Sequence, residues 1–253
     1  MHLKIMDLIR KKEADNTNQR GVTIAFLGDS VTQGCFEVYK KRDNRIETIF
    51  DRNATYHGYL SQIFSMLFPS VPINIINAGI SGGSAPHGFK RLENDVLRYN
   101  PDLVVVCFGL NDANAGLDYL KRYETALRDI FQRLQKEKIE VIFMTPNMMN
   151  TELSEHINDK EIMKMAEVTR KTQCSGIMDA YVAAAKNVCK TLNVPVCDCY
   201  AKWKTLYENG VNVTELLANK INHPMREMNW LFAISLVETM MKSEGEAYEN
   251  SKE

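Results

Sequence analysis

Short runs of apolar, mostly β-branched residues recur along the chain and predict the strands of a sheet. Their apolar character is continuous rather than alternating, which is typical of strands buried on both faces of a parallel sheet. The five runs are Val22–Leu27, Ile73–Ile76, Leu103–Phe108, Val141–Met144 and Val194–Cys197. We therefore expect a central sheet of five mostly parallel strands.

Apolar residues at steps of three and four fill the segments between these runs and predict helices. The spacing is clearest over residues 59–67, 120–134 and 177–188, and a last helix is expected over about 225–241. Strands that alternate with helices indicate βαβ units joined by right-handed crossovers. The fold class predicted is α/β, a three-layer α/β/α sandwich with a five-stranded, mostly parallel central sheet.

No linker, repeat or shift in composition divides the chain, so a single domain over residues 1–253 is expected, with its core at about 20–242. Residues 1–19 are interpreted as an N-terminal arm, and residues 243–253 as a frayed tail. The stretch from 36 to 55 is polar and charged with little periodicity. It is predicted to form a long loop at the rim of the sheet, where such loops often shape a pocket.

Composition narrows the class of protein. The chain is 45% hydrophobic and carries a formal net charge of −1, which supports a sizeable core and gives no sign of nucleic-acid binding. No apolar run is long enough for a membrane span, and Asp7 interrupts the N-terminal apolar stretch, so no signal peptide is expected. The six cysteines lack zinc-site spacing. We expect a cytoplasmic protein with reduced thiols, and the sequence leaves a homo-oligomer open.

Three polar, glycine-containing segments follow the first three predicted strands. They are Gly28-Asp29-Ser30, the Asn77–Gly83 segment and Gly109-Leu110-Asn111-Asp112. The carboxyl ends of parallel strands lie at one edge of a sheet, where open α/β sheets bind ligands. A serine there can act as a nucleophile, and glycine N–H groups or an asparagine amide can donate to an oxyanion. Each segment alone also fits a plain turn.

A histidine follows in Ile221-Asn222-His223-Pro224, before the last predicted helix. Histidine can accept a proton from a serine hydroxyl near neutral pH. A single histidine near a helix start is more often structural, so this segment gains weight only with the other three.

The four segments in this order resemble the SGNH hydrolases, also called the GDSL-like lipase/acylhydrolase family. The resemblance extends from about Val22 to Met241 and implies a flavodoxin-like arrangement of the sheet. It implies that Ser30 is the nucleophile and that His223 is its base. It also implies an oxyanion hole formed by the Ser30 N–H, the Gly82 N–H and the Asn111 side-chain amide.

The chain departs from the family pattern at two positions. Lys220 stands three residues before the histidine, where the family usually has the triad aspartate. We expect the backbone carbonyl of Lys220 to accept the ring N–H of His223 instead, with Asn219 or Asn222 as weaker candidates. The second departure is Gly83, where family members often carry a polar or acidic residue.

Other residues near these segments are candidates for substrate contact. Asp29 and Asp112 are assigned mainly to loop hydrogen bonds, and they remain candidates together with Gly83 and Tyr56. No metal is expected, because His and carboxylate residues show no ligand spacing. The acyl chemistry needs no cofactor.

The expected function is hydrolysis of small carboxylic esters, with an acetyl group on a carbohydrate as the favoured substrate. The final Asn-His-Pro block and the polar 36–55 stretch resemble acetylesterase-like members of the family more than its lipases. The alternatives are a thioesterase or lysophospholipase, distinguished by acyl-chain preference, and a catalytically silent carbohydrate-binding relative. Lys220 is the feature that favours the silent relative.

Overall fold

The protein is built around a five-stranded parallel sheet, and this confirms the predicted fold class. The computed structural model describes residues 3–249, and within them the strand order is β4-β1-β5-β6-β7. Every pairing in this sheet is parallel. The strands are β1 (Val22–Gly28), β4 (Ile73–Gly79), β5 (Leu103–Cys107), β6 (Glu140–Met144) and β7 (Val196–Cys197).

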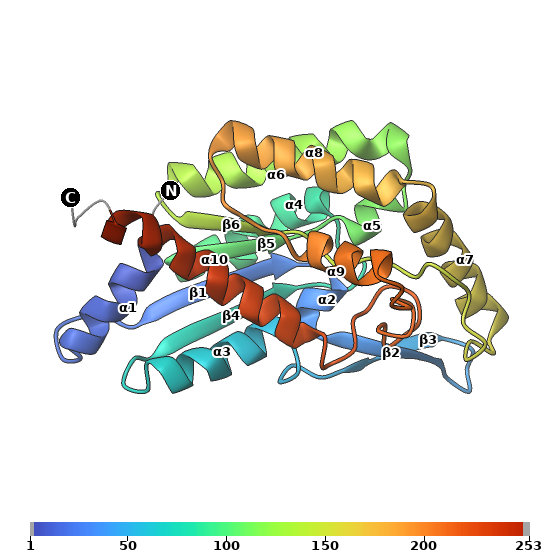
Figure 1. Ribbon diagram of the computed structural model, residues 1–253, viewed down its shortest axis with the longest axis horizontal. Coiled ribbons are helices and arrows are strands. Elements are labelled where there is room, and N and C mark those ends of the chain that lie inside the picture. The colour runs from blue at the N-terminus through green and yellow to red at the C-terminus, as the bar shows by residue number, and fades with distance from the viewer. Residues whose placement is uncertain (1–2, 250–253) are drawn as a thin grey trace.

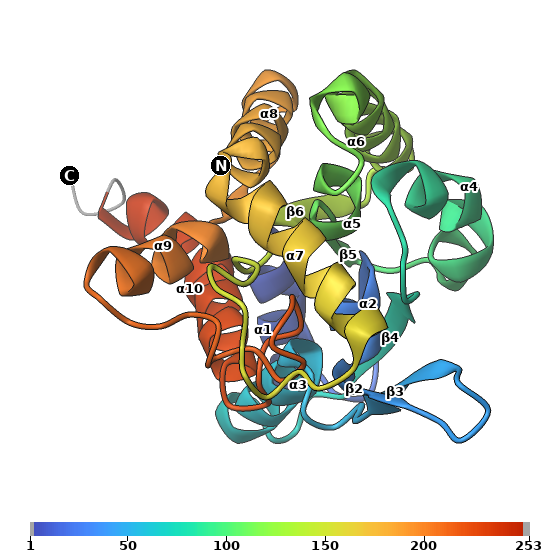
Figure 2. The same ribbon diagram turned by 90° about the vertical axis from the view of Figure 1, so that its right-hand side faces the viewer.

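Helices cover both faces of the sheet and complete the three layers (Figures 1 and 2). One face carries α4 (Ala85–Asp95), α6 (Leu120–Lys136) and α8 (Ile177–Leu192). The other carries α1 (Ile5–Ala14), α3 (Tyr56–Leu67) and α10 (Asn229–Glu249). Because helices lie on both sides, every residue of the central strand β5 is buried, which accounts for the continuous apolar run in its sequence. The remaining helices are α2 (Ser30–Gln33), α5 (Leu110–Ala113), α7 (Lys160–Cys174) and α9 (Cys199–Glu208), with short 3-10 turns at Leu97–Tyr99 and Leu117–Tyr119.

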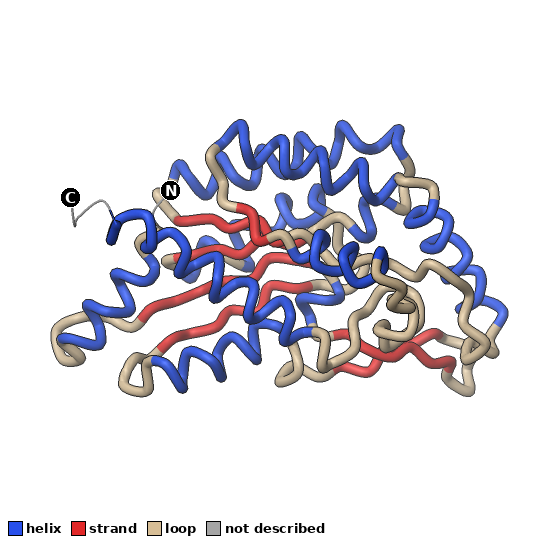
Figure 3. The backbone as a smooth tube through the Cα atoms, viewed as in Figure 1, coloured by secondary structure: helices blue, strands red, loops and turns tan. Residues whose placement is uncertain are grey.

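The prediction of a long loop over residues 36–55 is wrong for most of its length. This stretch forms an antiparallel hairpin of β2 (Cys35–Lys40) and β3 (Ile46–Phe50), which pair only with each other. Figure 3 shows the hairpin as two red strands apart from the central sheet. Beyond the buried Cys35 and Phe36, the residues of its strands are half-buried or exposed, so the strands lack the continuous apolar run that marks a strand buried on both faces.

Both ends of the chain differ from their predicted forms. Residues 5–14 of the expected arm are the helix α1, whose Ile5, Met6 and Ile9 are buried in the core. The expected tail is helical up to Glu249 as part of α10, and residues 250–253 lie outside the described part of the chain. Within residues 3–249, no helix is long and apolar enough to cross a membrane.

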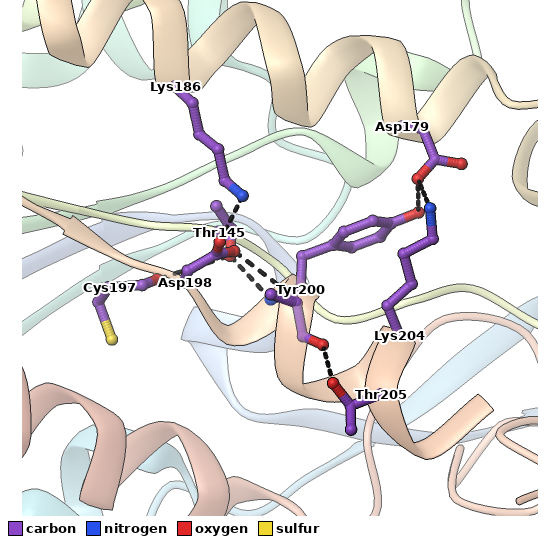
Figure 4. Close-up of polar contacts among 9 residues, drawn as sticks. Thr145, Asp179, Lys186, Cys197, Asp198, Tyr200, Lys204 and Thr205 are labelled. Atoms are coloured by element: carbon purple, nitrogen blue, oxygen red, sulfur yellow. Dashed lines mark hydrogen bonds and ion pairs between the residues drawn. The ribbon is translucent and has the colours of Figure 1, made fainter. Parts of the chain in front are cut away.

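A polar cluster fixes α9 to the rest of the fold (Figure 4). The Tyr200 N–H donates to Thr145 Oγ1 at 2.8 Å, at the end of β6. Asp198 caps α9 and pairs with Lys186 of α8, while Lys204 of α9 pairs with Asp179 at 2.7 Å. The segment that leads to His223 leaves the end of α9, so this cluster anchors the start of that segment.

Candidate active site

Ser30 lies where β1 ends and α2 begins, at the carboxyl edge of the sheet. Asp29 caps α2 by accepting the Val31 N–H at 3.0 Å, which fixes the turn that carries the serine. Gly28 has no room for a side chain, because an added Cβ would lie 2.0 Å from Thr32 Oγ1. Ser30 is therefore held in a tight strand-to-helix turn, with 3% of its surface exposed.

His223 lies in a structured loop between α9 and α10. The Oδ1 atom of Asn219 accepts the N–H groups of Ile221, Asn222 and His223 at 2.9–3.0 Å. A β-bridge pairs Leu217 with Pro224. The last helix begins at Asn229 rather than near residue 225, so this loop and not a helix entrance orients the histidine.

The two side chains meet, although 193 residues separate them in the sequence. His223 Nε2 lies 2.9 Å from Ser30 Oγ, and His223 Nδ1 lies 2.8 Å from the carbonyl oxygen of Phe36. A carbonyl can only accept, so Nδ1 carries the ring proton of the neutral imidazole. Nε2 is then the acceptor for the Ser30 hydroxyl, which is the arrangement that a general base requires.

The prediction that the Lys220 carbonyl accepts the ring N–H is wrong, since the Phe36 carbonyl holds that place. Lys220 has a left-handed φ of 58° within the loop, and its Nζ bonds to Glu215 at 2.8 Å. The acceptor comes from β2, at the other end of the sequence. Although Lys220 stands where the family usually has an aspartate, the His223 ring still has an acceptor for its Nδ1–H. That acceptor is the Phe36 carbonyl, which can only accept a hydrogen bond.

Burial sets the protonation state of the histidine. His223 is 6% exposed, and this burial lowers its pKa to about 4. The bond to the Phe36 carbonyl and the charge of Glu37 oppose that shift. At neutral pH the imidazole is therefore neutral and able to accept a proton.

N–H groups of the kind that can donate to an oxyanion line the same cavity as the serine. Asn111 directs its Nδ2 to the Gly83 carbonyl at 2.9 Å, and this bond fixes the amide while leaving its second N–H available. Gly82 has a positive φ of 72° and is exposed. Among the described residues, the backbone N–H groups of Ser30 and Gly82 have no acceptor. The structure thus brings together the four residues predicted as Ser30, His223, Gly82 and Asn111.

A cavity of about 350 Å³ opens above these residues. The hairpin forms one wall through Val38, Ile46 and Phe50, and Met165 of α7 lies on its rim. A second cavity of about 250 Å³ shares Gly82 and Asn111 with the first and is also lined by Tyr119 and Arg122. The serine therefore faces a small pocket of mixed polarity with an adjoining recess.

The remaining predicted contacts fall in different places. Tyr56 is fully buried with its hydroxyl 2.8 Å from Thr32 Oγ1, so its predicted substrate contact is wrong. Asp29 and Gly83 are likewise buried, and they act as a helix cap and as the acceptor for Asn111 instead.

Asp112 accepts the Ala85 N–H at 3.0 Å and lines the second cavity, so its contact with substrate stays a prediction. Burial raises the pKa of both Asp29 and Asp112 to about 7.

Sequence reasoning missed the Phe36 carbonyl as the partner of the His223 ring. Every residue carries a backbone carbonyl, so nothing in the identity of Phe36 marks it as an acceptor. Among the side chains that the structure describes, those of residues 3–241, no three His, Cys, Asp or Glu gather in a way that could hold a metal ion.

Comparison with known proteins identifies the family. The model of the GDSL-like Lipase/Acylhydrolase family matches residues 26–231. An acetylxylan esterase from Geobacillus stearothermophilus is 26% identical over 200 residues, which cover 74% of this chain and 82% of that protein. The chain therefore belongs to the GDSL-like lipase/acylhydrolase family and is a hydrolase that acts on ester bonds.

Solved structures share the fold. The crystal structure of the acetylxylan esterase from Geobacillus stearothermophilus superposes with a TM-score of 0.64 at 23% identity, covering 87% of this chain and 94% of that one. A two-domain esterase active on acetylated mannans gives a TM-score of 0.65 at 17% identity, covering 95% of this chain and 53% of that one. The α/β architecture, with its central parallel sheet, is thus common to these enzymes.

Proposed function

We propose that this hydrolase removes acetyl groups from a carbohydrate through an acyl-enzyme on Ser30. The observation that carries the proposal is the 2.9 Å contact between His223 Nε2 and Ser30 Oγ, beside the donors Gly82 and Asn111. A nucleophile, a base and preorganised donors are the groups that acyl transfer needs. The cavity of about 350 Å³ leaves room for an acyl group beside Ser30.

The reaction would proceed in two balanced halves. Ser30 Oγ attacks the ester carbonyl carbon while its proton passes to His223 Nε2. The tetrahedral oxyanion accepts bonds from the N–H groups of Ser30 and Gly82 and from Asn111 Nδ2. When the C–O bond breaks, Nε2 returns the proton to the sugar oxygen. Water then attacks the acetyl-enzyme by the same route and releases acetate and the free serine.

The carbohydrate part of the proposal rests on the relatives. The curated relative is an acetylxylan esterase, and one structural neighbour is active on acetylated mannans. The adjoining cavity, with the exposed Tyr119 and Arg122, offers an aromatic and a charged side chain beside the proposed oxyanion donors. Sugars commonly bind such mixed surfaces through stacking and hydrogen bonds.

The test is acetate release from acetylated xylo-oligosaccharides, together with hydrolysis of p-nitrophenyl acetate, butyrate and octanoate. Wild type should act fastest on acetyl esters, and Ser30→Ala should abolish the activity. Ser81→Ala is the matched control, since Ser81 lines the same cavity without contacting His223. Faster octanoate hydrolysis would favour a lipid or thioester substrate, and no hydrolysis of any ester would favour the silent binding relative.

A further inference from the structure

The acceptor that orients His223 belongs to a hairpin outside the central sheet. Phe36 is the second residue of β2, and β2 pairs only with β3. The pairing shifts register between Cys35 and Val38, so Phe36 lies in an irregular part of the ladder. Hydrogen bonds of the central sheet therefore do not fix the Phe36 carbonyl. Its position against the imidazole depends on the burial of the Phe36 side chain, which is 1% exposed, and on the contacts made by that ring and by the neighbouring Glu37.

Arg226 contacts the Phe36 ring and two carboxylates of the same hairpin region. Its Nη1 and Nη2 donate to the two oxygens of Glu37 at 2.6 and 3.1 Å, and its Nε donates to Asp51 at 3.2 Å. The guanidinium carbon lies 4.3 Å from the centre of the Phe36 ring. The Arg226 side chain thus contacts Glu37, Asp51 and the Phe36 ring.

We propose that Arg226 is a positioning residue that holds the Phe36 carbonyl on His223 Nδ1. With Glu37, Asp51 and Phe36 it forms what we call the Arg226 clamp. Arg226 follows His223 by three residues, so one loop supplies the base and also fixes the acceptor of that base. The planar guanidinium suits this task, because its paired donors fix direction as well as distance. The proposal rests on the proposed roles of Ser30 and His223.

The side chains of the Arg226 clamp are partly exposed to solvent. The clamp is therefore expected to position the Phe36 carbonyl without adding much to the stability of the fold. The side chains of Arg226, Glu37 and Asp51 are 31%, 39% and 35% exposed. Ion pairs with this much solvent contact add little to the stability of a fold. Loss of the clamp should therefore leave the melting temperature within about 3 °C of wild type, while the geometry at His223 loosens.

The kinetic test compares Arg226→Gln, Arg226→Lys and the control Arg45→Gln on p-nitrophenyl acetate. Arg226→Gln should lower kcat by about 10- to 100-fold, because a displacement of about 1 Å at a catalytic group has effects of that size. KM should stay within about twofold. Arg226→Lys keeps the charge without the paired donors, so its kcat should be intermediate. Arg45 pairs with Asp43 in the same hairpin, away from Phe36, and Arg45→Gln should match wild type.

A second test needs no substrate. The ¹⁵N and ¹H signals of the His223 ring, assigned with His223→Gln, should show a protonated Nδ1 and an unprotonated Nε2 in wild type. In Arg226→Gln the Nδ1–H proton should exchange with water at least about tenfold faster, since its acceptor is no longer fixed. Because this readout is independent of turnover, it tests the clamp even if no ester is hydrolysed.

Three results would overturn the clamp. They are an unchanged Nδ1–H signal in Arg226→Gln, an equal loss of kcat in Arg45→Gln, and an effect confined to KM. Should Arg226→Gln fail to fold, Arg226→Lys and Glu37→Gln take its place with the same criteria. An inactive wild type would instead count against the proposed function, whereas an active wild type with a fully active Arg226→Gln would count against the clamp alone.

Discussion

Two buried histidines in this protein make nearly the same contacts. His223 joins the Ser30 hydroxyl to the Phe36 carbonyl, and His57 joins the Thr55 hydroxyl at 3.0 Å to the Thr32 carbonyl at 2.9 Å. Burial lowers the pKa of each to about 4. A histidine between a hydroxyl and a carbonyl is therefore not in itself a mark of an active site.

The two regions differ in tautomer and in surroundings. The carbonyl partner requires the proton on Nε2 in His57 but on Nδ1 in His223. Thr55 is fully buried and its hydroxyl caps α3 by accepting the Gly58 N–H at 3.1 Å. The Ser30 hydroxyl lines a cavity beside Asn111 and Gly82. Access from a cavity and neighbouring N–H donors distinguish the proposed catalytic pair, Ser30 and His223, from Thr55 and His57.

The largest expected effect separates the two hydroxyl groups. Ser30→Ala should lower kcat for p-nitrophenyl acetate by at least about 10⁴-fold, because it removes the nucleophile. Thr55→Ala should leave kcat within about threefold of wild type. Steady-state kinetics on both purified variants decides the matter, and comparable losses in the two would refute the distinction drawn between the regions.

A smaller effect on kcat is expected from removing the side-chain amide of Asn111, a donor found beside His223 but not beside His57. Asn111→Ala should lower kcat by about 10²–10³-fold, the range found when one oxyanion-hole donor is removed. The change should appear in kcat more than in KM, since the bond forms mainly in the transition state. A variant that altered KM alone would assign Asn111 to ground-state binding.

The pH profile sharpens the comparison further. His223 must be neutral to accept the Ser30 proton, so activity is lost as pH falls through its pKa of about 4. We expect kcat/KM to be level from about pH 5.5 to 8 and to fall about tenfold per pH unit below 4. A midpoint near 6.5 would contradict the effect of burial.

Protonation of His57 accompanies this titration and affects the fold. Its folded pKa of about 4 lies below the ordinary value of 6.5, so the stabilisation is complete above pH 6.5 and is lost as pH falls toward 4. Circular dichroism at each pH therefore has to accompany the kinetics. An activity loss at a pH where the fold persists belongs to His223.

The smallest effect expected is on stability in the structural region. Thr55→Ala removes the side-chain cap of α3 and should cost about 1 kcal/mol of unfolding free energy. Urea unfolding would measure it, with Ser30→Ala as the comparison. If Ser30→Ala lost more stability than Thr55→Ala, the serine would have the larger structural role, contrary to the comparison.

The sequence predicted well the groups that follow buried strands. Ser30 and Asn111 each come soon after an apolar run, and Gly82 comes three residues after β4, so the topology of a parallel sheet brings them to one edge. It did not predict the hairpin, because most residues of β2 and β3 are half-buried or exposed and the two strands pair only with each other. The available signal was Asn44, whose left-handed φ of 66° turns the chain between the two strands.

The acceptor for the His223 ring N–H could not be predicted from the amino-acid sequence. Spacing from the histidine favours Lys220, but spacing specifies order along the chain and not the direction of a carbonyl. The residue that takes the place, Phe36, lies 187 positions away and acts through an atom that every residue has. Such a contact depends on how a loop and a hairpin pack, which periodicity does not encode.

The most direct measurement is covalent labelling with a fluorophosphonate, which loses fluoride to an activated serine. Intact mass and peptide mapping should show one adduct, on Ser30, in wild type and in His57→Gln. Ser30→Ala and His223→Gln should remain unlabelled under the same conditions. An adduct on another residue of wild type, or labelling of His223→Gln at the wild-type rate, would contradict the assignment of Ser30 and His223 as the catalytic pair.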